Sequence, residues 1–257
     1  MEIIPIPCLY DNYAYLIVNE QSCEAAVVDL PEAWPVMREI AERELTLTAV
    51  LCTHHHHDHI GGIDDLLDEY GPIPVFGFHE DTKRIPHLTE LVQDNDQFEV
   101  CGTTARVLHT PGHTTTSVVF QIEEHLFVGD TLFGAGCGRL FEGTPAQMVR
   151  SLDRIAGCSR ESRIYFGHEY TELNLRFAAE VDPTNPAVGV RRKEVAEMRA
   201  KGVPSAPSTL AEELATNPFL RIEDAAIIEE LQAGQQLSDT DRVSVFAALR
   251  EKRNHFS

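Results

Sequence analysis

Hydrophobic residues recur in two different rhythms along the chain, and the change from one to the other falls near residue 170. Before that point, short apolar or alternating runs are separated by turn residues, which is typical of strands. They predict strands at 13–18, 24–29, 45–52, 73–76, 105–108, 117–121, 125–128 and 163–166. Helical spacing predicts helices at 31–44, 63–70 and 145–155. This mixture predicts an α/β domain with many hairpins rather than a regular βαβ series.

After residue 170 only helical patterns remain. They predict helices at 172–180, 186–201, 209–215, 224–231 and 239–253, with a loop rich in glycine, proline and serine at 202–208. A chain of 257 residues suits one large domain with an appendage. We therefore expect a catalytic domain over residues 1–171 and a helical substrate-binding domain over residues 172–257.

Composition and charge narrow the class of protein. The chain is 43% hydrophobic and 24% charged, as in ordinary globular proteins. Its net charge of −20 falls mostly on residues 1–172, so nucleic acid is not an expected partner. No apolar run is long enough for a membrane span and no signal peptide is recognisable, so we expect a cytoplasmic protein without a membrane partner. Six cysteines without a Cys-x-x-Cys pair indicate reduced thiols.

The most informative segment follows the apolar stretch 45–52, where residues 53–59 read Thr-His-His-His-His-Asp-His. The pattern His-x-His-x-Asp-His provides imidazoles and a carboxylate, which suit zinc, iron or manganese. It lies at the end of a predicted strand, where open α/β sheets place their sites, and we expect a helix to begin at Gly62. A tag sequence, a solvated histidine-rich loop and a closed structural zinc site are alternatives. A catalytic metal site fits best.

Three later segments offer further ligands at predicted strand ends, each directly after a glycine. One such residue alone is usually part of a turn, but the combination with the first motif favours a metal site. The candidate ligands are His54, His56, Asp58, His59, His113, Asp130 and His168. Because seven ligands exceed the needs of one tetrahedral zinc, we predict two divalent metal ions, zinc with iron or manganese as alternatives.

The ligands divide naturally between the two ions. His54, His56 and His113 would hold one ion, Asp58, His59 and His168 the other, and Asp130 would bridge them. A bridged pair of metals makes hydroxide from water near neutral pH, which favours hydrolysis of an acyl or phosphoryl compound. We expect this metal-bridging hydroxide to be the nucleophile, with Asp58 and Asp130 orienting it. We also expect Asp29 to orient a ligand histidine. The remaining histidines have no motif and are expected to be structural or to support the site.

These segments together resemble the metallo-β-lactamase superfamily and, within it, the glyoxalase II or hydroxyacylglutathione hydrolase family. The narrower likeness is carried by 136–139, 167–171, 208–213 and 217–219, with smaller contributions from 11–13 and 129–133. The resemblance implies a four-layer αβ/βα sandwich with a small C-terminal helical domain. It also implies hydrolysis of the small-molecule thioester S-D-lactoylglutathione to D-lactate and glutathione, and we expect a monomer.

The resemblance further implies the residues that bind the glutathione moiety: Arg139, Phe141, Tyr170, Arg250 and Arg253. Arg139 and Phe141 stand where the family usually has lysine and tyrosine, and Arg253 stands where lysine is typical. Without the resemblance, Arg250 and Arg253 read as the solvated end of a helix, where basic residues favour the helix dipole.

Other functions remain open at this point. One is a persulfide dioxygenase of the same superfamily with a single iron. A β-lactamase is a weaker alternative because of the long helical tail. A third possibility, from a different class, is a non-catalytic metal-binding protein that retains the ligands.

Overall fold

The computed structural model describes residues 1–235, 237 and 239–256 and divides into two compact units. Unit 1 comprises residues 1–109, 116–129 and 165–168. Unit 2 comprises residues 110–115, 130–164 and the described part of 169–257. The two units interleave along the chain, and the domain boundary expected after residue 171 stays a prediction.

Unit 1 contains a six-stranded mixed sheet in the order β1-β2-β3-β4-β5-β6. Its strands are β1 (Glu2–Cys8), β2 (Asn12–Asn19), β3 (Glu24–Val28), β4 (Thr46–Leu51), β5 (Val75–Phe78) and β6 (Glu90–Val92). The pairs from β1 to β3 are antiparallel, and those from β3 to β6 are parallel. Because parallel strands end at the same edge of a sheet, Asp29 after β3 and Thr53 after β4 lie close together.

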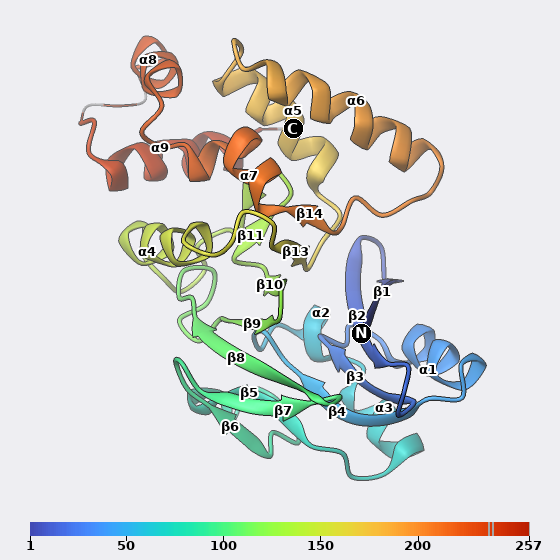
Figure 1. Ribbon diagram of the computed structural model, residues 1–257. Helices are drawn as coiled ribbons and strands as arrows, with labels where there is room; N and C mark the ends of the chain where they lie inside the picture. Colours follow the sequence, from blue (N-terminus) through green and yellow to red (C-terminus); the bar gives the residue numbers. More distant parts are fainter. Residues whose placement is uncertain (236, 238, 257) are drawn as a thin grey trace. The chain divides into compact units, whose positions relative to one another are not determined.

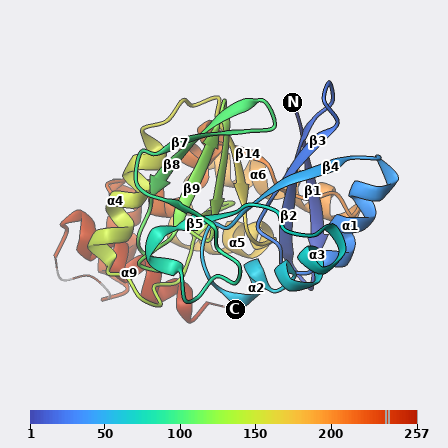
Figure 2. The same ribbon diagram turned by 90° about the horizontal axis from the view of Figure 1, so that it is seen from below.

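Helices α1 (Ala33–Glu42) and α3 (Ile63–Tyr70) pack on this sheet. Val36, Ile40 and Leu66 point inward and are fully buried in one hydrophobic cluster with the strands. Figure 2 shows α1 and α3 together beside β1 and β2. The helical spacing of these apolar residues therefore matches the face that each helix buries.

A second run of strands in unit 1 is antiparallel and has the order β10-β9-β8-β7. The strands are β7 (Gln97–Val100), β8 (Thr103–His109), β9 (Val118–Ile122) and β10 (His125–Gly129). At the end of β10, Gly129 has φ +48, and a Cβ there would overlap the Thr53 hydroxyl. Only glycine meets both conditions, so Gly129 lets the chain turn closely past Thr53.

Unit 2 is mainly helical. Its helices are α4 (Pro145–Ala156), α5 (Thr171–Val181), α6 (Pro186–Ala200), α7 (Leu210–Thr216), α8 (Ala225–Ala233) and α9 (Arg242–Asn254), and a 3₁₀ turn, η2, covers Pro218–Leu220. Figure 1 shows α5 alongside α6, and the two helices share a small apolar cluster. The strands of the unit are short: β11 (Leu132–Phe133) pairs with β12 (Gly136–Cys137), and the first half of β13 (Arg163–Phe166) pairs with β14 (Ser208–Thr209).

The expected helices and strands are present with ends shifted by a few residues, and α3 and β13 have the expected bounds. The sequence reading missed β1 because Pro5 and Pro7 interrupt it. These prolines are tolerated because β1 is an edge strand, where some backbone N–H groups have no partner strand. The helix expected to begin at Gly62 is α3, which has Gly62 as its N-cap, but a short helix within the histidine motif, α2 (His57–Ile60), was not predicted.

No helix among residues 1–235 and 239–256 combines the length and the apolar character that crossing a membrane requires.

Candidate metal centre

A buried carboxylate anchors the histidine motif in unit 1. Asp29 accepts hydrogen bonds from the Thr53 backbone N–H and from the Thr53 hydroxyl, each at 2.8 Å. Its Oδ2 lies 2.8 Å from His59 Nδ1. Because a carboxylate can only accept, the proton of His59 sits on Nδ1, and Nε2 is left with a lone pair for a metal. The expectation that Asp29 lies against a candidate ligand histidine thus agrees with the observed geometry.

A second carboxylate performs the same task for His168. Asp11 Oδ1 lies 2.9 Å from His168 Nδ1, which places the proton on that nitrogen and leaves Nε2 facing the site. The neighbouring Asn12 donates to the Asp58 backbone oxygen at 2.9 Å and to its carboxylate at 3.2 Å. Sequence reasoning gave neither residue a role, although a polar pair at the start of the buried strand β2 was a usable signal.

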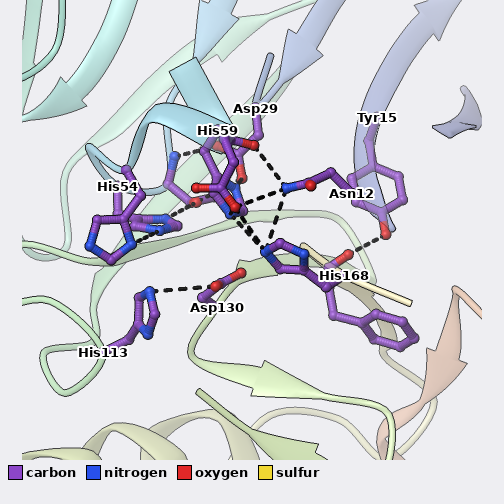
Figure 3. Close-up of polar contacts among 12 residues, drawn as sticks. Asn12, Tyr15, Asp29, His54, His59, His113, Asp130 and His168 are labelled. Atoms are coloured by element: carbon purple, nitrogen blue, oxygen red, sulfur yellow. Dashed lines mark hydrogen bonds and ion pairs between the residues drawn. The ribbon is translucent and has the colours of Figure 1, made fainter. Parts of the chain in front are cut away.

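Three of the expected ligands converge in unit 1. The Nε2 atoms of His59 and His168 are 3.3 Å apart, and Asp58 Oδ2 lies 3.4 Å from His168 Nε2 and 3.9 Å from His59 Nε2. Ligands bound tetrahedrally at zinc–nitrogen distances of about 2.0–2.1 Å are about 3.3 Å apart. The three atoms therefore fit around one metal ion, and Figure 3 shows His59 and His168 turned toward each other.

The rings of His54 and His56 also lie close together, with their centroids 4.7 Å apart. His54 Nε2 and His56 Nδ1 are 3.1 Å apart, while His54 Nδ1 lies 3.1 Å from the Thr53 hydroxyl. That hydroxyl donates to Asp29, so it accepts from His54. The tautomer of His54 is thus set in the same way as that of His59, through one intervening hydroxyl.

Unit 2 contributes the other two expected ligands, His113 and Asp130. His113 Nε2 lies 3.4 Å from Asp130 Oδ2, and its Nδ1 donates to the Arg139 backbone oxygen at 2.9 Å. Both side chains are at least nine-tenths buried. A Cβ at Gly138 would overlap the Asp130 backbone oxygen, so this segment closes tightly on itself. His113 therefore also presents Nε2, on the same side as a carboxylate.

Unit 2 gathers three arginines of the set implied by the family. Arg250 is 6% exposed and donates to the Cys137 backbone oxygen at 2.7 Å. Arg253 donates through Nε and Nη2 to Asn174. Burial, followed by the positive charges of Arg250 and Arg139, lowers the pKa of Arg253 to about 10. The charges of Arg139 and Arg250 therefore act on Arg253, and positive charge is concentrated in this part of a chain whose net charge is −20.

The two aromatic candidates differ in their surroundings. Tyr170 is half-buried and lies edge-on to Phe133, with ring centroids 5.3 Å apart. Phe141 is 63% exposed and lies edge-on to His113 at 5.2 Å. Phe141 thus offers an apolar surface beside a candidate metal ligand.

The other histidines make contacts typical of structural residues. His55 lies 3.7 Å from the buried Asp81, His109 stacks on Phe78, and His125 Nδ1 lies 2.9 Å from the Tyr165 hydroxyl. Thiol chemistry is disfavoured at Cys137, because burial raises the pKa of its thiol to about 11.

Comparison with known proteins gives matches over nearly the whole chain. The model of the metallo-β-lactamase superfamily matches residues 10–168, and that of the hydroxyacylglutathione hydrolase C-terminus matches residues 169–256. A hydroxyacylglutathione hydrolase of Synechococcus sp. is 45% identical over 258 residues and covers 100% of each chain. Another, of Methylobacillus flagellatus, is 46% identical over 255 residues and covers 99% of each chain.

Solved structures with the same fold are more distant in sequence. ETHE1 from Myxococcus xanthus has a TM-score of 0.66 and 27% identity over 98% of each chain. The BLEG-1 B3 metallo-β-lactamase has a TM-score of 0.64 and 24% identity, and the match covers 85% of this chain and 99% of the lactamase chain. This second likeness concerns the fold alone.

The fold and the clustered histidine and aspartate ligands define a metallo-β-lactamase-superfamily protein, and these clusters indicate a site for two metal ions. Within the superfamily, the chain belongs to the hydroxyacylglutathione hydrolase family, also called glyoxalase II. The α/β fold class with a C-terminal helical part and the family expected from the sequence are both confirmed.

Proposed function

We propose that the protein hydrolyses S-D-lactoylglutathione to D-lactate and glutathione with two bound metal ions. The observation that carries this proposal is the full-length match to hydroxyacylglutathione hydrolases at 45–46% identity. The ligand geometry and the arginine cluster support it as well, because a metal centre can activate water for thioester hydrolysis and arginines can bind the carboxylates of a glutathione conjugate.

Seven side chains of the chain are the proposed ligands of the two metal ions. Asp58, His59 and His168 would hold one ion, His54, His56 and His113 would hold the other, and Asp130 would be shared between them. Zinc suits this set of imidazoles and carboxylates, and iron and manganese are the alternatives. The distances of 3.3–3.9 Å among the first three ligand atoms support their assignment to one ion.

The residues of the chain divide the remaining work. Arg139, Arg250 and Arg253 attract the carboxylates of the glutathione moiety, and Tyr170 and Phe141 line its path. When bound, the metal ions would polarise the thioester carbonyl and lower the pKa of the attacking water. Asp58 and Asp130 orient that water and accept its proton. The C–S bond then breaks, and the glutathione thiolate leaves and takes up a proton.

The proposal also includes a cytoplasmic location, a monomer, no nucleic-acid or membrane partner, and a helical substrate-binding domain that begins at residue 172. The acidic chain and the concentration of substrate-binding arginines after residue 138 are consistent with it.

The test compares two reactions on one metal-analysed sample of the full chain. We expect S-D-lactoylglutathione to be hydrolysed with release of one thiol per thioester, and a chelator to abolish the reaction. We expect no oxygen consumption with glutathione persulfide. Oxygen consumption without thioester hydrolysis would instead identify a persulfide dioxygenase. Metal binding without either reaction would favour the non-catalytic alternative.

A further inference from the structure

Two buried side chains hold the hairpin β11–β12 from one side. Asn217 Nδ2 donates to the Phe133 backbone oxygen at 3.2 Å and to that of Gly136 at 2.9 Å. The Glu213 carboxylate accepts from the Ala135 backbone N–H at 2.8 Å and from Asn217 at 3.0 Å. Asn217 is fully buried, and Glu213 is 2% exposed. The backbone of the hairpin turn is therefore bonded to the end of α7.

Asn174 of α5 holds the same turn from another side. Its Nδ2 donates to the Gly134 backbone oxygen at 3.0 Å. Its Oδ1 accepts from Arg253 Nε at 3.1 Å and from Nη2 at 3.0 Å. A Cβ at Gly136 would overlap the amide of Asn174. One amide thus joins the hairpin to Arg253, and the hairpin packs closely against that amide.

The position of the hairpin in the chain gives these contacts a functional consequence. Asp130 stands two residues before β11, and Arg139 stands two residues after β12. The Arg139 backbone oxygen fixes the His113 ring through the 2.9 Å hydrogen bond to Nδ1. Arg250 binds the Cys137 backbone oxygen at the end of β12. Displacement of the hairpin would move two candidate metal ligands and the arginines together.

Burial raises the pKa of the Glu213 carboxyl, and the hydrogen bonds from Ala135 and Asn217 together with the charge of Arg191 partly offset that rise. A buried polar network of this kind rigidifies one arrangement when its members are satisfied. The three side chains, Asn174, Glu213 and Asn217, are called the hairpin clamp below.

We propose that the hairpin clamp is a positioning device of the helical C-terminal segment: it fixes the 130–139 segment so that Asp130 and His113 meet a metal ion while Arg139 and Arg253 meet the anionic end of the substrate. The proposal rests on the proposed function for its substrate half. It gives Asn174, Glu213 and Asn217 the role of positioning residues that do not touch the substrate. In this role they couple metal binding to substrate binding.

The test variant is Asn217→Asp, which removes both donations to the hairpin but keeps the oxygen that accepts from the Phe219 backbone N–H at 3.1 Å. Asn185→Asp is the matched control in the same unit. Asn185 also accepts from a helix N-terminal N–H, that of Ala187, and donates to a backbone oxygen, that of Ala215, but these hydrogen bonds do not involve the hairpin. Asn174→Asp is a second variant, since it loses the donor to Gly134 and keeps an acceptor for Arg253.

Two readouts are taken on the full chain: zinc affinity by competition with a chelator, and kcat and KM for S-D-lactoylglutathione. For Asn217→Asp we expect zinc affinity and kcat/KM each to fall by about tenfold or more, as for other residues that orient ligands. Asn174→Asp should show the larger rise in KM. Asn185→Asp should match the wild type in both, even if its unfolding temperature falls as much.

The proposal is overturned if Asn217→Asp and Asn174→Asp retain wild-type zinc affinity and KM, or if Asn185→Asp loses as much as they do. Zinc competition separates this outcome from failure of the proposed function. If the wild type does not hydrolyse the thioester, the substrate assignment fails, while the zinc affinities of the variants still decide whether the clamp positions the metal ligands.

Discussion

Asp29→Asn is the substitution that tests the metal centre with the least change in shape. Asp29 has φ +54, a conformation that asparagine tolerates nearly as well, so the backbone need not move. The native carboxylate accepts from donors on both of its oxygens, with Thr53 N–H on one and His59 on the other. Whichever way the new amide is turned, its NH₂ group faces a donor. The result is an opposed Thr53 N–H or a His59 ring that must change tautomer or orientation.

Both outcomes have a calculable size. A buried donor without an acceptor costs about 1–3 kcal/mol of stability. A misoriented ligand histidine lowers metal affinity by about 10–100-fold, which equals about 1.4–2.8 kcal/mol. We therefore expect Asp29→Asn to bind zinc about 10–100-fold more weakly than the wild type in a chelator competition.

Asp81→Asn is the matched control for that substitution. Asp81 is fully buried and is paired with Arg84, but its neighbouring histidine is His55, which is not among the proposed ligands. It should lose stability and keep its zinc affinity. Equal zinc affinities for wild type and Asp29→Asn, or an equal loss of zinc affinity in Asp29→Asn and Asp81→Asn, would refute the claim that Asp29 orients His59 for zinc.

Three further outcomes follow from the same geometry. Arg253→Ala should raise KM for the thioester by about 10–100-fold with little change in kcat, because a charge-assisted contact with the substrate is lost. A fall in kcat with an unchanged KM in steady-state kinetics would contradict this prediction. Wild type should bind S-methylglutathione more tightly than Arg253→Ala does, and this difference in affinity should shrink as the pH rises through about 10. The lowered pKa of Arg253 means that its side chain loses its proton and charge there. A difference that stays constant from pH 8 to pH 11 would contradict this prediction. Alkylation at about pH 8 should label the exposed Cys23 without loss of activity and should spare Cys137, whose buried thiol stays protonated. Detection of alkylated Cys137 by mass spectrometry would contradict the prediction that this thiol is unreactive.

Each candidate ligand could be proposed from the sequence because a local pattern marks it. His54 to His59 form one motif, and His113, Asp130 and His168 each follow a glycine at a strand end. Such patterns can be recognised in the sequence because the fold places its site at the carboxyl ends of strands, directly after an apolar run. The family assignment rests on the same segments.

Most of the residues that orient the candidate ligands or fix their segments could not be predicted from the sequence. Asp11 meets His168 across 157 positions of sequence, and Asn217 meets Phe133 across 84. No local periodicity encodes such pairs, because they depend on how distant elements pack. Asp29 was an exception, since it stands at the end of β3, next to the strand that leads into the histidine motif.

Element boundaries failed where a local preference was overruled by packing. The prolines of β1 argue against a strand, yet the edge position permits them. His57 to Ile60 form a helix too short to show a period, with Asp58 and His59 on it. In both cases tertiary contacts, rather than propensity, decide the local structure.

Two metal ions acting together in thioester hydrolysis are the centre of the function proposed for this protein. The decisive measurement is a titration of metal-free protein with zinc, in which S-D-lactoylglutathione hydrolysis and bound zinc are followed on the same samples. We predict that activity rises until two zinc ions are bound per chain and then stays constant. Full activity with one ion, or no activity with two, would contradict the account.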